Sequence, residues 1–89
     1  VRFRISYREK KGLTRRYRRQ LTAIIEREGN GYVSLCPELD IASQGDTIGE
    51  ARINLREALE LFFETVSPAE IQTRLREEVY VTQVEVAVG

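Results

Sequence analysis

The sequence has 89 residues, enough for one domain that buries roughly 60–65% of the surface its unfolded chain exposes. Its hydrophobic fraction of 42% is that of a globular protein, and no run approaches the roughly 18 apolar residues of a membrane span. There is no His and a single cysteine, Cys36, which excludes an intrachain disulfide and removes the commonest general base and metal ligand. We therefore expect a cytoplasmic binding protein without metal or cofactor, and not an enzyme.

The formal net charge of zero conceals two oppositely charged parts. Residues 1–20 hold nine Lys or Arg and one acid, a charge of +8. Residues 21–89 hold five Arg and thirteen Asp or Glu, a charge of −8. The sequence therefore predicts a basic N-terminal arm (residues 1–20) attached to an acidic domain (residues 21–89).

The arm begins with apolar and basic residues that alternate over positions 1–8, a pattern typical of an amphipathic strand. A turn is expected at Lys11-Gly12, so the arm is compatible with a hairpin, a tail or a strand that orders on a partner. Cations among aromatic residues suit nucleic-acid binding, and the candidate contacts are Arg15, Arg16, Arg18 and Arg19. We favour two other interpretations over this one: an arm that folds onto the acidic domain, and an upstream extension without function.

The acidic domain opens with three predicted strands, at residues 21–28, 32–36 and 41–44. Gly29-Asn30-Gly31 has the chemistry of a tight hairpin between the first two strands. Pro37 ends the second strand because it cannot donate to a ladder, and Gly45-Asp46 closes the third. These residues predict a three-stranded meander.

Two helices should follow. Thr47 and Glu50 form a capping box that starts a helix ending near Val66. Its predicted core stripe consists of Ile48, Ala51, Leu55, Ala58, Leu59, Phe62 and Val66. Ile53 projects instead among glutamates, where burial within the monomer is not expected. Ser67 and the Pro68 that follows it start a second helix of about two turns, with Ile71 and Leu75 as its apolar edge.

The run Val79–Val88 is the strongest strand pattern in the chain, but its apolar face switches near Thr82-Gln83. Three explanations fit: a bulge, a strand that pairs with a second subunit, and a central strand covered on both faces. We expect a homo-oligomer, a dimer or tetramer, with an interface of Tyr80, Val81, Val84, Val86 and Val88. The expected fold class is α+β, in the order β-β-β-α-(short α)-β.

Several motifs of the acidic domain occur in a specific order: residues 24–32 (IIEREGNGY), 36–39 (CPEL), 42–47 (ASQGDT), 50–62 (EARINLREALELF), 78–82 (EVYVT) and 84–86 (VEV). Together they span about three-quarters of the chain and resemble the HicB family of antitoxins. The resemblance implies a partial RNase H-like fold without the metal-binding acids of the nuclease. It also implies an antitoxin of a type II toxin-antitoxin system, which binds a HicA-type ribonuclease and covers its catalytic surface. An acidic domain suits that role, because a toxin that grips RNA must be basic.

The resemblance suggests a partner-binding set of Glu26, Glu28, Tyr32, Glu38, Asp40, Ile53, Glu57 and Glu60. The chain departs from the family in two ways. Many relatives have Pro-Gly-Cys where this chain has Asp40-Ile41-Ala42, which changes a turn and keeps the register. Full-length relatives usually carry a C-terminal DNA-binding domain, for which we see no room before Gly89, so autorepression is not carried over.

Two alternatives to the antitoxin belong to other functional classes. An orphan HicB-like domain would act as a nucleic-acid-binding or regulatory protein through its basic arm. A hydrolase would need a cluster such as Asp40, Asp46 and Glu50, but Asp46 lies at a turn and Glu50 is used by the capping box. Cys36 has no His to activate it, so we expect a structural thiol.

Overall fold

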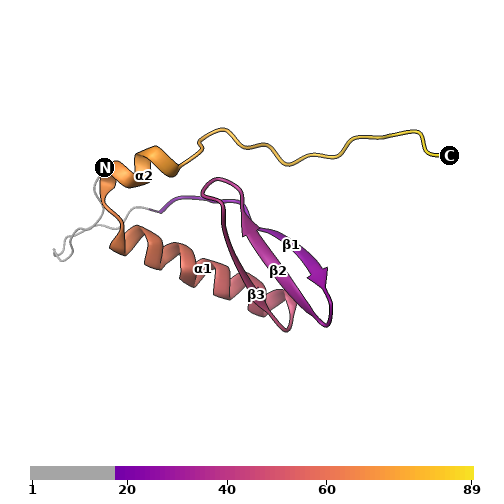
Figure 1. Ribbon diagram of the computed structural model, residues 1–89, viewed down its shortest axis with the longest axis horizontal. Coiled ribbons are helices and arrows are strands. Elements are labelled where there is room, and N and C mark those ends of the chain that lie inside the picture. The colour runs from indigo at the N-terminus through magenta and orange to yellow at the C-terminus, as the bar shows by residue number, and fades with distance from the viewer. Residues whose placement is uncertain (1–17) are drawn as a thin grey trace.

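The computed structural model describes residues 18–89 (Figure 1). The elements are β1 (Ile24–Glu28), β2 (Gly31–Cys36), β3 (Ile41–Gly45), α1 (Ile48–Thr65) and α2 (Pro68–Arg74). This arrangement confirms the α+β class and the three-stranded meander followed by two helices. The expectations placed on residues 1–17, including the contacts at Arg15 and Arg16, lie outside the described residues, whereas Arg18 and Arg19 are exposed.

The three strands form one antiparallel sheet in the order β1-β2-β3. Gly29 and Asn30 connect β1 to β2, and Gly29 has φ 61°, as at the first position of a type II′ turn. Asp40 also has a positive φ, of 57°, in the tight loop before β3. The amide of Asp40 donates to the carbonyl of Cys36 over 2.8 Å, which closes this loop. Short local turns therefore set the register of the whole sheet.

Both helices start where the capping residues predict. The Thr47 hydroxyl accepts from the Glu50 amide over 3.0 Å, and the Glu50 carboxylate accepts from the Asp46 amide over 2.8 Å, one residue before the cap. The Ser67 hydroxyl likewise accepts from the Glu70 amide over 3.2 Å. One part of the predicted core stripe is wrong: Ile48, the first residue of α1, is 55% exposed.

The core lies between one face of the sheet and α1 and is closed at one end by α2 (Figure 1). Its buried apolar members are Cys36, Leu39, Leu55, Phe62 and Ile71. Burial of these side chains is the main force that holds the helices on the sheet.

Two polar or small residues allow α1 to approach the sheet closely. The buried hydroxyl of Ser34 donates to the carbonyl of Ala51 over 2.8 Å, so it has a partner inside the core. A Cβ at Gly45 would lie 2.6 Å from the amide nitrogen of Ala51, so only glycine fits at the end of β3.

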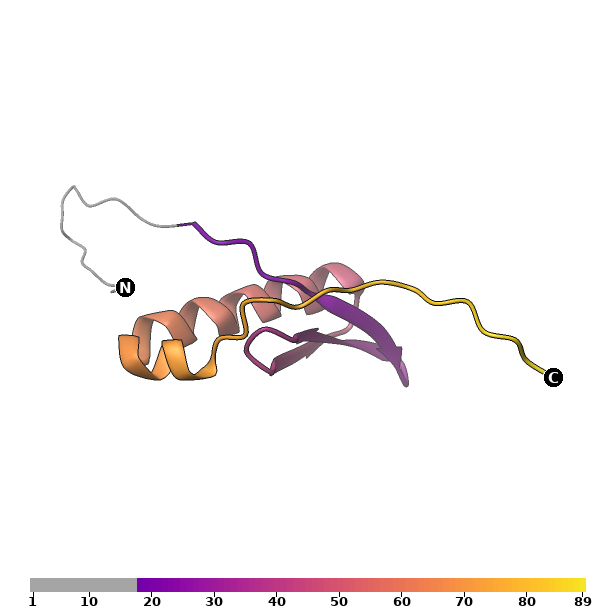
Figure 2. The same ribbon diagram turned by 90° about the horizontal axis from the view of Figure 1, so that it is seen from above.

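The predicted strand Val79–Val88 is wrong as a member of this sheet. From Leu75 onward the described chain has no regular secondary structure, and it runs extended away from the domain (Figures 1 and 2). The amide of Arg76 donates to the carbonyl of Glu38 over 2.8 Å, which fixes the start of this segment. A strand needs ladder partners as well as β-propensity, and within residues 18–89 no strand supplies them to this segment.

Candidate protein-interaction surface

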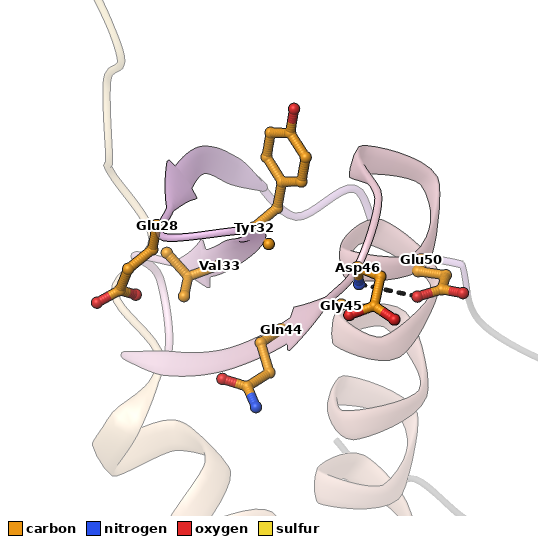
Figure 3. Close-up of a pocket in the computed structure, with 8 residues that line it drawn as sticks. Glu28, Tyr32, Val33, Gln44, Gly45, Asp46 and Glu50 are labelled. Carbon is orange, nitrogen blue, oxygen red and sulfur yellow. Dashed lines mark hydrogen bonds between the residues drawn. The ribbon is translucent and has the colours of Figure 1, made fainter.

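The sheet has one covered face and one open face. Ser34 and Cys36 of β2 are buried against α1, so the alternating residues of β2 and their register partners point the other way. We call this opposite side the open sheet face; it consists of Ile24, Glu26, Glu28, Val33, Leu35, Ala42 and Gln44. Figure 3 shows part of it: Glu28, Val33 and Gln44 lie on one side of the sheet, and Tyr32 on the other.

An apolar row crosses the open sheet face. Ile24, Leu35 and Ala42 are register partners on β1, β2 and β3, and Leu35 is 36% exposed. Neighbouring positions carry Glu26 and Glu28, both exposed, and the seven residues of this face include no Lys or Arg. A partly exposed apolar row beside carboxylates, on a face without basic residues, is typical of a protein-binding surface for a basic partner.

The open sheet face continues into a shallow depression at the end where β3 leads into α1 (Figure 3). Three carboxylates line it, those of Glu28, Asp46 and Glu50. Gly31 and Gly45 let two strands approach here, since a Cβ at Gly31 would lie 2.9 Å from the carbonyl oxygen of Gly45. The depression therefore extends the negative surface toward the first turn of α1.

Glu38 belongs to the predicted binding set, but its carboxylate is used within the chain. It accepts from the Thr22 amide over 3.1 Å at each oxygen and from the Thr22 hydroxyl over 2.7 Å. Desolvation raises the pKa of Glu38, but the hydrogen bonds from Thr22 and Cys36 outweigh it, so the pKa lies below its ordinary value of 4.5. This carboxylate therefore stays ionised and bound at neutral pH, which favours a structural role.

The remaining predicted contacts lie elsewhere. Ile53, Glu57 and Glu60 are exposed on the side of α1 that faces away from the sheet. That side has mixed charge, and Arg56 pairs with Glu60 over 3.4 Å. One rigid partner cannot contact the outer side of α1 and the open sheet face at once, because the domain lies between them.

The last two predicted contacts lie apart from both surfaces. Tyr32 is on the covered side of the sheet, where its hydroxyl accepts from Arg27 over 3.0 Å. Asp40 is exposed in the β2–β3 loop.

The groups considered for catalysis do not form a site. Asp40 precedes β3 and Asp46 follows it, so the five residues of the strand, roughly 17 Å, separate them. Within residues 18–89, no three His, Cys, Asp or Glu side chains come together as a metal ion requires. Burial raises the pKa of the Cys36 thiol, so it is protonated at neutral pH and enclosed in the core.

The sequence pattern did not single out Ile24, Val33, Leu35 and Gln44 as surface residues. Leu35 in particular sits between buried neighbours in an apolar run, where β-strand alternation alone leaves open which face is covered. The useful signal was Ser34, because a small polar residue inside an apolar strand often marks a close helix contact.

These features define a small α+β module with an acidic, partly apolar surface on one side of its sheet. The chain is similar to the UPF0150 protein ssl0738 of Synechocystis, with 51% identity over 47 residues. The match covers 51% of this chain and 65% of that relative. No family description matches the chain, and no solved structure matches it significantly. In the part that the structure describes, no helix is long and apolar enough to cross a membrane.

Proposed function

We propose that this protein is a HicB-like antitoxin that acts in the cytoplasm, binding a HicA-type ribonuclease and covering its catalytic surface. The observation that carries the proposal is the open sheet face, which offers Glu26 and Glu28 beside a partly exposed apolar row. The ordered motifs of residues 21–88 support it, and so does the order of three antiparallel strands followed by a helix, with which a partial RNase H-like fold begins.

The physical basis is competition with RNA. A ribonuclease binds the phosphate backbone with cations, and the −8 charge of residues 21–89 attracts the same cations. Glu26 and Glu28 would pair with them, and the row around Leu35 would exclude water from the centre of the contact. The charge attraction would raise the association rate, and burial of the apolar row would lower the dissociation rate.

The test is rescue of bacterial growth when a HicA-type toxin is co-expressed with this chain. We expect Glu26→Lys/Glu28→Lys to abolish rescue and to weaken complex formation by about 100-fold or more, since two desolvated charge pairs become repulsive. The matched control is Glu57→Lys/Glu60→Lys on α1, which changes the net charge equally and should still rescue.

Two outcomes would contradict the proposal. Equal loss in both double variants would show that overall charge matters and not this surface. Absence of any complex, together with a salt-dependent shift of DNA or RNA that disappears on deletion of residues 1–20, would favour an orphan regulatory domain that acts through its basic arm.

A further inference from the structure

The sheet has two edge strands, β1 and β3, and β3 is already tied to α1 by the hydrogen bond of 2.8 Å from the Asn54 side chain to the Gln44 carbonyl. Two other parts of the described chain lack a β-sheet partner. The first is the outer edge of β1, because β1 pairs with β2 alone among residues 18–89. Its outward N–H and C=O groups form a template for a further strand. The second is the C-terminal segment, Val79–Val88, which no strand of the described chain meets.

The C-terminal segment has the composition of a β-strand, and its apolar side chains are exposed to solvent. Five of its ten residues are Val, with a Tyr and a Thr between them and no Gly or Pro. Its large apolar side chains are exposed to between 61% and 86%: Tyr80, Val81, Val84, Val86 and Val88. A run of this kind in water is a strong template for intermolecular pairing.

The segment also leads away from its own domain. Arg76 holds its start at the β2–β3 loop, through its amide and through a contact of 3.4 Å from its guanidinium to the carbonyl of Pro37. From there both views show the chain extending beyond the sheet to a distant C-terminus (Figures 1 and 2). The radius of gyration is 16.1 Å, against roughly 11–12 Å for a compact chain of this size.

We propose that the C-terminal segment of one copy adds as a strand to the outer edge of β1 in a second copy, which returns its own segment in the same way. The occupant of the β1 edge is therefore Val84–Val88, the half of the segment that lies farther from its own domain. Its five residues match the five residues of Ile24–Glu28. Reciprocal exchange has two-fold symmetry and uses the β1 edge and the C-terminal segment of both copies, so it ends at a dimer.

The switch of the apolar face fits this division of the segment. Val79 and Val81 would share one side of an extended strand, at the end of the segment nearer its own domain, and Val79 is already half-buried. Val84, Val86 and Val88 share the other side, so all three valines fall on one face of the extended partner sheet. If all ten residues of Val79–Val88 paired as one strand, the five-residue edge of β1 would be too short for them, and a change of the apolar face within the segment would serve no purpose.

The first test is analytical ultracentrifugation of the full chain with paired substitutions. Successive amides of a strand point to opposite edges, so either position 84 or position 85 donates to β1. We expect the unmodified chain to be a dimer. At least one of Val84→Pro and Glu85→Pro should weaken it by about tenfold or more, since proline removes a ladder donor. Val84→Ala and Glu85→Ala keep the amide and should weaken it less than their proline counterparts. Circular dichroism should show unchanged helix content, because the substituted positions lie ten or more residues beyond the end of α2.

The second test identifies the acceptor edge. In a dimer assembled from isotope-labelled and unlabelled chains, filtered nuclear Overhauser spectra should show intermolecular contacts between amides of Ile24–Glu28 and protons of Val84–Val88. A chain that stays monomeric at millimolar concentration would overturn the proposal. So would a dimer that neither proline weakens, or contacts between these strands that arise only within one chain.

Discussion

Glu38 connects three parts of the chain that are far apart in sequence. Its carboxylate holds Thr22 just before β1 and contacts the Cys36 thiol at 3.4 Å, while its carbonyl holds Arg76 after α2. Hydrogen bonds to a charged group each contribute about 1.5–3 kcal/mol when both partners are sheltered from water. Glu38 therefore stabilises the entry and the exit of the domain at a single point.

This arrangement makes folding stability depend on pH. Because the folded pKa of Glu38 is lowered, its stabilising effect is present above the ordinary value of 4.5 and is lost as the pH falls through the folded value. We expect Glu38→Gln to reduce the free energy of unfolding by about 1–3 kcal/mol at pH 7, and by progressively less as the pH falls below 4.5 and the native carboxyl takes up a proton. Urea unfolding over a series of pH values from 7 downward measures this difference. Glu57→Gln, on the exposed side of α1, is the control; an equal loss there would refute the assignment.

The residue scale is where sequence reasoning was weakest. Glu38 was predicted to contact a partner, because a carboxylate in a loop gives no sign of a bond to a residue 16 positions away. Cys36 was predicted correctly as a structural thiol, since the absence of His is visible in the sequence alone. Chemistry that depends on residue type was predictable, whereas chemistry that depends on a distant neighbour was not.

At the scale of elements, the position of α1 depends on a glycine at the end of β3. A methyl group at Gly45 would meet the backbone nitrogen of Ala51 at 2.6 Å and the Cβ of Glu50 at 2.7 Å. Neither atom can move without shifting the first turn of α1, which the Thr47 cap also fixes.

We therefore expect Gly45→Ala to destabilise the domain by about 1–3 kcal/mol, the usual cost of overpacking. Gly49→Ala is the matched control in the same region, because its nearest neighbour, the Thr47 hydroxyl oxygen, lies 3.9 Å from the added Cβ. That variant should gain about 0.5–1 kcal/mol, since alanine favours a helix over glycine. Thermal unfolding of the two variants checks the opposite signs; equal destabilisation by both would show that the close contact at Gly45 is not the cause.

The predictability of the elements follows the range of their interactions. Both helices and the β1–β2 hairpin were predicted because caps and turn residues act over a few positions. The C-terminal strand was predicted but is absent from the described sheet, because a strand pattern shows a tendency to pair and does not identify a partner. Ile48 shows the same limit within a helix, since the helical period places it on the apolar stripe, but the period does not tell whether the sheet covers the first residue of α1.

At the scale of the whole molecule, the two proposed surfaces are neighbours. Glu26 and Glu28 lie on β1, the strand whose outer edge would receive the segment of a second copy. A fourth strand beside β1 would widen the open sheet face, so a partner bound there would contact both copies. The outer side of α1 takes no part in either contact and stays in solvent.

A strand exchange also makes stability depend on protein concentration. A chain of 89 residues has a small core, and the second copy would cover apolar side chains that the monomer leaves in water. For a two-fold dimer, a tenfold rise in concentration favours the folded dimer by about 1.4 kcal/mol, or about 0.7 kcal/mol for each chain. In a domain of this size that amount raises Tm by roughly 3–6 °C.

Differential scanning calorimetry over two decades of concentration should show this increase in Tm at each tenfold step for the unmodified chain. The proline variant that is monomeric should show none, because its unfolding has become unimolecular; a Tm independent of concentration in both would mean that the valines of the C-terminal segment remain uncovered in solution.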